Sequence, residues 1–417
     1  MDPGDLDPGQ EVDLNEDDVI EVIDEDGERN GGEIAVEMGD MDLEHYDEEE
    51  DDISNDEMLQ EGALAPPASD DAETCFNAHK GSVFSCVLEP GGQSLAISGG
   101  EDDKAFVWNT SNGEVVLECS GHKDSVTCVG FNFDGTLAAT GDMSGIVKVW
   151  KVETKKEIWS FEGSDLEWLR WHPLANVLLG GTSEGDVWMW KIPSGDCKMM
   201  QGHGCQSTCG KIMPDGKRCI VGYEDGSCKV WDLKDQVCLH HIKKGGHNHT
   251  DSITCIDCHK DNVMALTGSV DGTAKLVNTN TGKVVATFPA GDVDDTIGDT
   301  NSVECLEFSP NQSMVAVGSL NGLLSIWDIP TQKLRHHCRA ETGIVRVRWD
   351  SASPVVCLGG LDGRVQLWDS RSGQRLSTYE GHSSEILDLD LSSDGNTILS
   401  ASGDGTCRIF KVTQPER

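Results

Sequence analysis

Apolar and polar residues alternate in short runs along most of the chain, and tight-turn sequences separate these runs. Residues 121–150 show the pattern clearly, because the runs SVTCVGF, LAAT and IVKVW are separated by turns at Asp134-Gly135 and Ser144-Gly145. Alternation with a period of two gives a strand one buried face, and Asp-Gly and Ser-Gly pairs suit hairpin turns. Residues 121–150 are therefore predicted to form a three-stranded meander, which needs similar neighbours to bury its apolar face.

The same unit recurs eight times after residue 79, at intervals of about 40 to 50 residues. Its clearest marker is the residue that ends the third run, which is Trp108, Trp150, Trp190, Trp231, Val277, Trp327, Trp368 and Phe410 in turn. Units of this length with four strands and with Gly-His and Trp-Asp pairs resemble the WD-repeat β-propeller family. The resemblance implies an all-β, eight-bladed propeller over residues 73–417.

In that family, each blade links a histidine, a serine or threonine, an aspartate and a tryptophan by hydrogen bonds. The first unit matches at all four positions, the second has Ser144 where the acid is expected, and the third, sixth and seventh lack the Gly-His pair. A half-satisfied buried network is costly, so blades without the histidine are expected to have lost its partners as well. The residues to which the resemblance assigns structural roles are His79, Ser98, Asp102, Trp108, His122, Thr140, Trp150, Asp225, Trp231, Asp271, Trp327, Asp362, Trp368, His382, Ser400 and Asp404.

The two ends of the repeat region are complementary. Only seven residues follow Phe410, too few for the fourth strand of the last unit, and the strand-like residues 73–78 precede the first Gly-His position. An unpaired strand edge is an aggregation hazard that propellers avoid. We expect residues 73–78 to pair with residues 405–412 and to complete the eighth blade.

The acidic residues are concentrated at the N-terminus. Residues 1–79 contain 30 of the 74 acidic residues and one of the 32 basic residues, and the net charge of the chain is −42. Low hydrophobicity with high net charge predicts a disordered acidic tail over residues 1–72. The tail is either a solubilising segment or an electrostatic lure for a basic client, with docking motifs at residues 19–23 and 34–36.

The turns that carry the Gly-His pairs and the aspartates are expected on one face of the disc. Several acids there have no predicted place in the internal networks, and together with the tail they favour a basic partner attracted by charge. Asp124 and Asp142 are the two in the second unit. The acids assigned to partner binding are Glu101, Asp103, Asp124, Asp142, Asp165, Glu167, Glu184, Glu224, Asp251 and Glu385.

Other kinds of chemistry find little support. The chain has no phosphate-binding loop, nucleophile elbow or HExxH motif, so we expect no enzyme, no catalytic residue and no cofactor. Cys255–His259 matches C-x-x-C-H, but on a strand these cysteines point to opposite faces, and we expect no metal. The acidic insertion at residues 289–301 lacks the spacing of a calcium loop.

Charge, composition and cysteine spacing also limit location and partners. The acidic field argues against nucleic acid, no run approaches the length of a membrane span, and the 16 scattered cysteines are typical of a reducing compartment. We expect a cytoplasmic monomer without a transmembrane segment.

A narrower resemblance rests on the runs GGEDDKAFVW, GHKDSVTC, TGDMSG, SDLEW and PDGKR after an acidic tail. They are similar to one branch of the WD-repeat family. This resemblance implies a non-enzymatic interaction scaffold with an unknown signalling partner, a role in cell migration and blood-vessel formation, and a peripheral membrane pool. A fungal relative in that branch implies an alternative, an escort chaperone for a basic large-subunit ribosomal protein.

Overall fold

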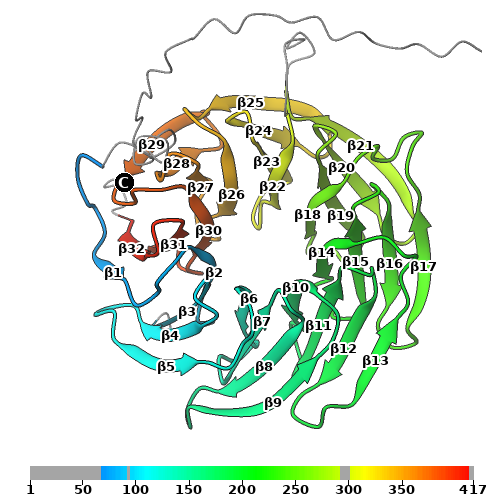
Figure 1. The fold of residues 1–417 in the computed structure, drawn as a ribbon. Helices are drawn as coiled ribbons and strands as arrows, with labels where there is room; N and C mark the ends of the chain where they lie inside the picture. Colours follow the sequence, from blue (N-terminus) through cyan, green and yellow to red (C-terminus); the bar gives the residue numbers. More distant parts are fainter. Residues whose placement is uncertain (1–66, 92–93, 292–300, 413–417) are drawn as a thin grey trace, which may run out of the picture. The chain divides into compact units, whose positions relative to one another are not determined.

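Eight four-stranded antiparallel sheets surround a common axis in the computed structural model, which describes residues 67–91, 94–291 and 301–412 (Figure 1). The eight-bladed all-β propeller predicted from the repeat is confirmed. In each blade the first strand lies next to the axis and the later strands lie progressively farther out (Figure 1). The predicted disordered tail falls outside the described residues up to residue 66, as does most of the acidic insertion at 289–301.

The strands follow the alternating runs of the sequence. Blade one contains β2 (Val83–Leu88), β3 (Leu95–Gly100), β4 (Ala105–Asn109) and β5 (Val115–Cys119); blade two contains β6 (Val126–Phe131), β7 (Leu137–Asp142), β8 (Ile146–Lys151) and β9 (Lys156–Glu162); blade three contains β10 (Leu166–Trp171), β11 (Val177–Thr182), β12 (Val187–Lys191) and β13 (Cys197–Met200); blade four contains β14 (Ser207–Ile212), β15 (Arg218–Tyr223), β16 (Cys228–Asp232) and β17 (Val237–Ile242).

The second half of the ring repeats this order. Blade five contains β18 (Ile253–Cys258), β19 (Met264–Ser269), β20 (Thr273–Asn278) and β21 (Lys283–Pro289); blade six contains β22 (Val303–Phe308), β23 (Met314–Ser319), β24 (Leu323–Asp328) and β25 (Lys333–Arg339); blade seven contains β26 (Ile344–Trp349), β27 (Val355–Gly360), β28 (Val365–Asp369) and β29 (Gln374–Tyr379); blade eight contains β30 (Ile386–Leu391), β31 (Thr397–Ser402), β32 (Cys407–Lys411) and β1 (Thr74–Phe76).

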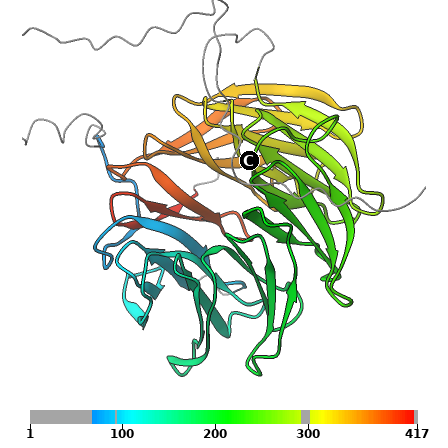
Figure 2. The same ribbon diagram turned by 45° about the vertical axis from the view of Figure 1, so that its right-hand side comes forward.

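Strand β1 closes the ring, as the sequence predicts. It pairs antiparallel with β32, with Cys75 opposite Arg408, and these two strands lie side by side in blue and red in Figures 1 and 2. The Phe76 ring stacks on Trp108 of blade one at a centroid distance of 4.6 Å. Asp70 also contacts Arg408 of blade eight, and Asp71 accepts the backbone N–H of Glu380, which lies in the connection between blades seven and eight. The N-terminal segment therefore joins the last blade to the first.

Carboxylates on the innermost strands provide a second link between blades. Asp388 and Asp390 of β30 accept hydrogen bonds from the backbone N–H groups of Cys86 and Leu88 in blade one, at 3.0 and 2.9 Å. Asp257 of blade five likewise accepts from the Phe308 N–H at 2.9 Å. Buried backbone N–H groups need hydrogen-bond partners, and these carboxylates supply them along the free edge of the innermost strand in the next blade. The sequence analysis assigned them no role.

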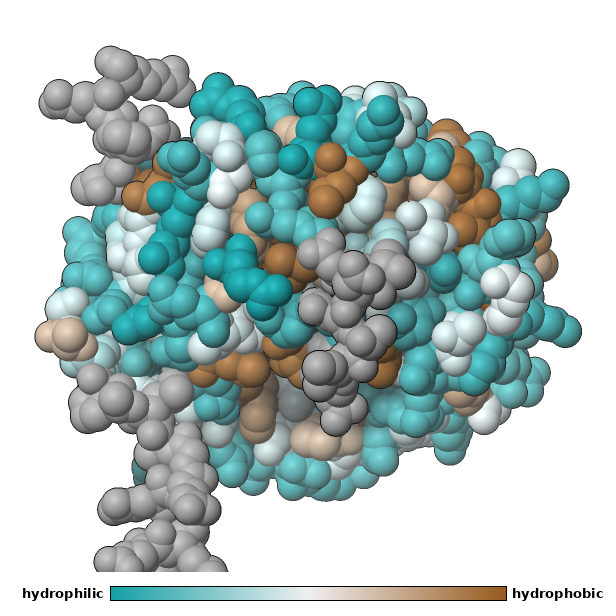
Figure 3. Space-filling model, turned by 90° about the horizontal axis from the view of Figure 1, so that it is seen from above, coloured by the Kyte–Doolittle hydropathy of each residue, from teal (hydrophilic) through white to brown (hydrophobic). Residues whose placement is uncertain are grey.

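The outer rim is mostly hydrophilic, with small separate hydrophobic areas (Figure 3). Partly exposed apolar side chains stand on the fourth strands, namely Val115, Met199, Val237, Leu239, Val285, Leu334 and Leu376. None of the described residues belongs to a helix long and apolar enough to cross a membrane.

Candidate functional site

One face of the propeller carries two kinds of turn from every blade. Because the strands of a blade are antiparallel, the start of the first strand lies beside the end of the second, as Val83 lies opposite Gly100. The turn that enters each blade and the turn between its second and third strands therefore emerge together. We call this surface the acidic face; in blade one its turns are residues 77–82 and 101–104.

Four blades bury a histidine beneath the acidic face. In blade one, His79 Nδ1 lies 2.9 Å from Asp102 Oδ1, and its Nε2 lies 2.9 Å from Ser98 Oγ. Trp108 Nε1 donates to the same Ser98 oxygen at 3.2 Å. In blade eight, His382 lies 2.9 Å from Asp404 and 2.7 Å from Ser400. The four-membered chain that the family resemblance implied is complete in blade one, and blade eight has its histidine, serine and aspartate, with Phe410 in place of the tryptophan.

Blade two corrects the sequence interpretation. We expected Asp142 to be free for a partner, but it is fully buried and lies 2.9 Å from His122 Nδ1. Ser144 Oγ donates to the other carboxylate oxygen of Asp142 at 2.8 Å. His122 Nε2 completes the network with Thr140 Oγ1 at 2.8 Å. The acid of this blade thus stands two residues before the expected position, and the prediction that Asp142 binds a partner is wrong.

Blade five contains a network of which the sequence analysis assigned only Asp271. His249 lies 2.9 Å from both Asp271 and Thr267, although Val277 replaces the tryptophan of this blade. Thr267 stands ten residues before Val277, which is the same interval as from Ser98 to Trp108. This ten-residue interval could have identified Thr267 as the hydroxyl of a histidine network from the sequence alone.

The buried networks shift the ionisation of their members. Burial lowers the pKa of His79, His122 and His382, because the charged imidazolium loses its hydration. Burial by itself raises the pKa of Asp142, but hydrogen bonds from Ser144 and from the backbone of Ile146 and Lys123 hold it below its usual value. The networks therefore favour a neutral imidazole beside an ionised carboxylate.

Every blade that buries its histidine has a hydroxyl ten residues before the terminal marker. Blades three, six and seven have Gly180, Val317 and Leu358 at that position and no Gly-His pair. Blade four is intermediate, because it keeps His203 but has Val221 there. His203 is exposed, with its Nε2 3.1 Å from Asp225 Oδ2.

The remaining residues with predicted structural roles stabilise turns or pack between blades and do not take part in the four histidine networks. Asp362 of blade seven accepts the backbone N–H of Arg364 at 3.2 Å within its own turn. Trp368 Nε1 donates to Gln366 at 3.1 Å, without a histidine. Trp231 is buried, Trp327 is half-buried, and both contribute to the packing between blades.

The other predicted partner-binding acids lie on or near the surface of the acidic face. Glu167 and Glu385 are half-buried. Four exposed bases, Lys80, Lys123, Lys243 and Lys244, share the turns of this face within the described ranges. The exposed acids are Glu101, Asp103, Asp124, Asp165, Glu184, Glu224 and Asp251.

These exposed carboxylates keep part of their hydrogen-bonding capacity. Glu101 accepts the Ser82 N–H at 3.0 Å, and Asp124 accepts the Ser125 N–H at 2.7 Å. Each of these contacts occupies one side of a carboxylate that can accept several hydrogen bonds. The acidic face can therefore bind ammonium, guanidinium or backbone N–H groups of a partner.

Comparison with known proteins places the chain in a family. The WD domain, G-beta repeat family matches residues 72–109, 113–151, 195–232, 236–278 and 373–411. Angio-associated migratory cell protein of Homo sapiens is 48% identical over 96% of this chain and 95% of its own length. The ribosome assembly protein SQT1 of Saccharomyces cerevisiae is 23% identical over 89% of this chain and 93% of its own length.

Solved structures share the fold. Sqt1 of Chaetomium thermophilum, crystallised bound to the N-terminus of the ribosomal protein L10, superposes with a TM-score of 0.74 at 22% identity. The match covers 82% of this chain and all of that one. The chain therefore belongs to the WD-repeat β-propeller family, in the group that includes angio-associated migratory cell protein.

Proposed function

We propose that this protein is a non-enzymatic binding scaffold whose acidic face holds a basic segment of a partner protein. The observation that carries the proposal is the set of seven exposed carboxylates on that face, distributed over blades one to five. Charge of one sign on a binding surface raises the rate of encounter with a partner of the opposite charge and rejects partners of the same charge. The net charge of −42 adds a long-range field of the same sign.

The partner that suits this surface is the basic N-terminal segment of a large-subunit ribosomal protein, which this chain would escort. The L10 segment bound by the Chaetomium thermophilum Sqt1 propeller supports this candidate by analogy of fold. The attraction between exposed charges is screened within about 8 to 10 Å at physiological salt, so binding should weaken steeply as salt is added.

The test measures binding of a labelled peptide with the L10 N-terminal sequence by fluorescence anisotropy. A variant with Glu101, Asp124, Glu184 and Glu224 changed to lysine should bind at least about tenfold more weakly at low salt. The matched control carries the same charge change on the opposite face, where Glu114, Glu153, Asp196 and Asp235 are exposed in turns between third and fourth strands. Equal binding by the two variants would overturn the proposal.

A second candidate is an adaptor in cell migration and blood-vessel formation, at a cytoplasmic or peripheral membrane location. The identity of 48% to angio-associated migratory cell protein favours it. An adaptor interface with an apolar centre should survive moderate salt, unlike an electrostatic escort. Affinity capture from migrating cells at low and high salt distinguishes the two, because an escorted ribosomal protein should be lost at high salt and a signalling partner retained.

A further inference from the structure

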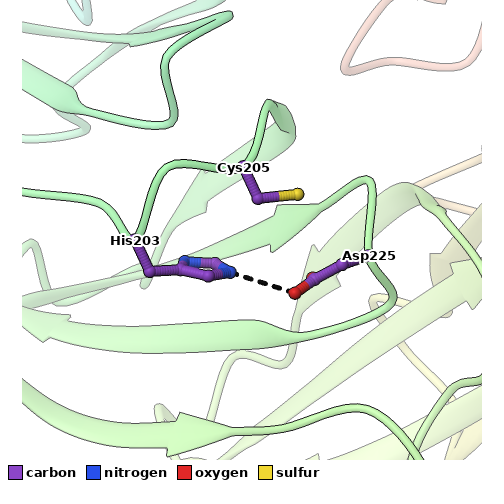
Figure 4. Close-up of side chains that lie close together, drawn as sticks. All are labelled: His203, Cys205 and Asp225. Atoms are coloured by element: carbon purple, nitrogen blue, oxygen red, sulfur yellow. Dashed lines mark hydrogen bonds and ion pairs between the residues drawn. The ribbon is translucent and has the colours of Figure 1, made fainter. Parts of the chain in front are cut away.

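Blade four brings together three side chains of different chemistry on the acidic face. His203 and Cys205 lie in the turn that leads into β14, and Asp225 lies in the turn between β15 and β16 (Figure 4). One ligand atom of each residue lies within 4.8 Å of the other two. His203 is exposed, and Cys205 and Asp225 are half-buried, so the group is accessible from solvent.

The absence of a hydroxyl at position 221 explains why the histidine of this blade is available. A neutral imidazole has one donor and one acceptor nitrogen, and burial requires a partner for each. His79, His122, His249 and His382 have a carboxylate on one side and a hydroxyl on the other. His203 has Asp225 but no hydroxyl at that position, because Val221 replaces it.

The thiol is also specific to blade four. In the other four blades with a network histidine, the residue two positions after it is Gly81, Asp124, Asp251 or Ser384. Gly204 adopts a φ of 77° before Cys205, a backbone conformation that glycine readily allows. Figure 4 shows the thiol and the imidazole on the same side of the turn.

We propose that His203, Cys205 and Asp225 bind Zn²⁺ through imidazole nitrogen, thiolate sulfur and carboxylate oxygen. Zinc accepts all three ligand types in tetrahedral sites, whereas calcium and magnesium prefer sites made of oxygen alone. The Cys205 thiol releases its proton to solvent when the metal binds. The fourth position remains open to water or to a side chain of a bound partner.

Neighbouring groups already orient the ligands. Ser227 N–H donates to Asp225 Oδ1 at 2.9 Å, which leaves Oδ2 directed at His203. The His203 ring packs edge-on against Tyr223 at 4.5 Å. The imidazole of His241 lies 5.0 Å from the His203 ring, and the Lys229 ammonium lies 5.6 Å from the Tyr223 ring. A hydrogen bond such as the one from Ser227 to Asp225, made by a residue outside the ligand set, fixes the orientation of a metal ligand.

Titration of the purified full chain with Co²⁺ and then Zn²⁺ tests the site. We expect one equivalent of Co²⁺ to produce tetrahedral visible bands and a thiolate charge-transfer band, and Zn²⁺ to displace both. In competition with a chromophoric chelator, Cys205→Ser and Asp225→Asn should each lower the zinc affinity at least about 100-fold. Cys197→Ser, which changes an exposed cysteine on the neighbouring strand β13, should leave it unchanged.

Two results would overturn the proposal: the absence of a thiolate band in the wild-type protein, or equal zinc affinity in Cys205→Ser and Cys197→Ser. A second measurement guards against misfolding of the variants. Zinc should raise the Tm of the wild type and of Cys197→Ser but not that of Cys205→Ser, while the three metal-free Tm values should agree. A zinc-dependent rise in Cys205→Ser would contradict the assigned ligand set. The outcome does not depend on which partner binds the acidic face.

Discussion

Blades one, two, five and eight bury a histidine between a carboxylate and a hydroxyl, whereas blade four leaves the equivalent His203 at the surface. The tryptophan does not explain the difference, because blades five and eight bury their histidines with Val277 and Phe410 in its place. The exact position of the acid does not explain it either, since blade two uses Asp142. The hydroxyl ten residues before the terminal marker is present in all four blades and absent from blade four, although blade four keeps the carboxylate of Asp225.

This comparison indicates what a buried imidazole requires in this fold. With two partners it is fully satisfied and stiffens the turns of the acidic face, and with one partner its burial would leave a polar nitrogen without a hydrogen bond. Blades three, six and seven have neither the hydroxyl nor the histidine. Blade four keeps the histidine without the hydroxyl at position 221, and its Nε2 contacts Asp225 at 3.1 Å and the Ser227 hydroxyl at 3.3 Å near the surface.

Removal of a network histidine should have the largest effect on stability. His122→Ala leaves Asp142 and Thr140 buried without their shared partner, and we expect a loss of about 3 kcal/mol in the free energy of unfolding. His203→Ala should cost less than about 1 kcal/mol, because the His203 side chain is partly exposed and its removal does not leave a fully buried carboxylate without a partner. Urea unfolding of both variants without added metal measures the difference. Similar losses would show that His122 and His203 contribute equally to the free energy of unfolding.

Acid should weaken the intact networks in a predictable window. Because burial lowers the pKa of His79, His122 and His382, the unfolded chain takes up protons first as the pH falls below about 6.5. The stability gained from a neutral buried histidine is present above that value and is lost below it, by at most about 1.4 kcal/mol per pH unit for each residue.

The control for this prediction is a variant without one of the titrating groups. His122→Gln has no imidazole in blade two, so its Tm deficit relative to the wild type should narrow between about pH 7.5 and about pH 5.5. A deficit that stays constant or widens would contradict the sign of the His122 pKa shift. Asp142, whose pKa is lowered, adds its own loss only at lower pH, below its ordinary value of 3.8.

Restoration of the missing hydroxyl should have the smallest effect. Val221→Thr supplies the absent partner in blade four, and we expect it to draw His203 inward and to stabilise the protein by about 1 kcal/mol. Val317→Thr is the matched control, because Val317 is buried at the equivalent position of blade six, which has no histidine in the turn that enters the blade. There the new hydroxyl gains no such partner, and a loss of about 1 kcal/mol is expected. Equal changes in Tm for the two variants would refute the role assigned to the hydroxyl.

Much of the architecture could be read from the sequence because it depends on local signals. The alternating runs predicted the strands, the spacing of the terminal aromatics predicted eight blades, and the missing last strand predicted the pairing of β1 with β32. The histidine networks of blades one and eight were also predicted, since each of their members matches the expected interval. The partner-binding role of the exposed acids remains a prediction.

The sequence by itself determined the fold, its blade number and the sign of its charge, because periodicity, turn residues and composition act within short stretches of chain. The tertiary structure alone decided which carboxylate completes the network of blade two. Asp142 and Ser144 stand two residues apart in one tight turn, and only the packed turn shows which of them reaches His122. It also decided that His203, Cys205 and Asp225 meet, since the two turns that carry them are separated along the chain and brought together by strand pairing.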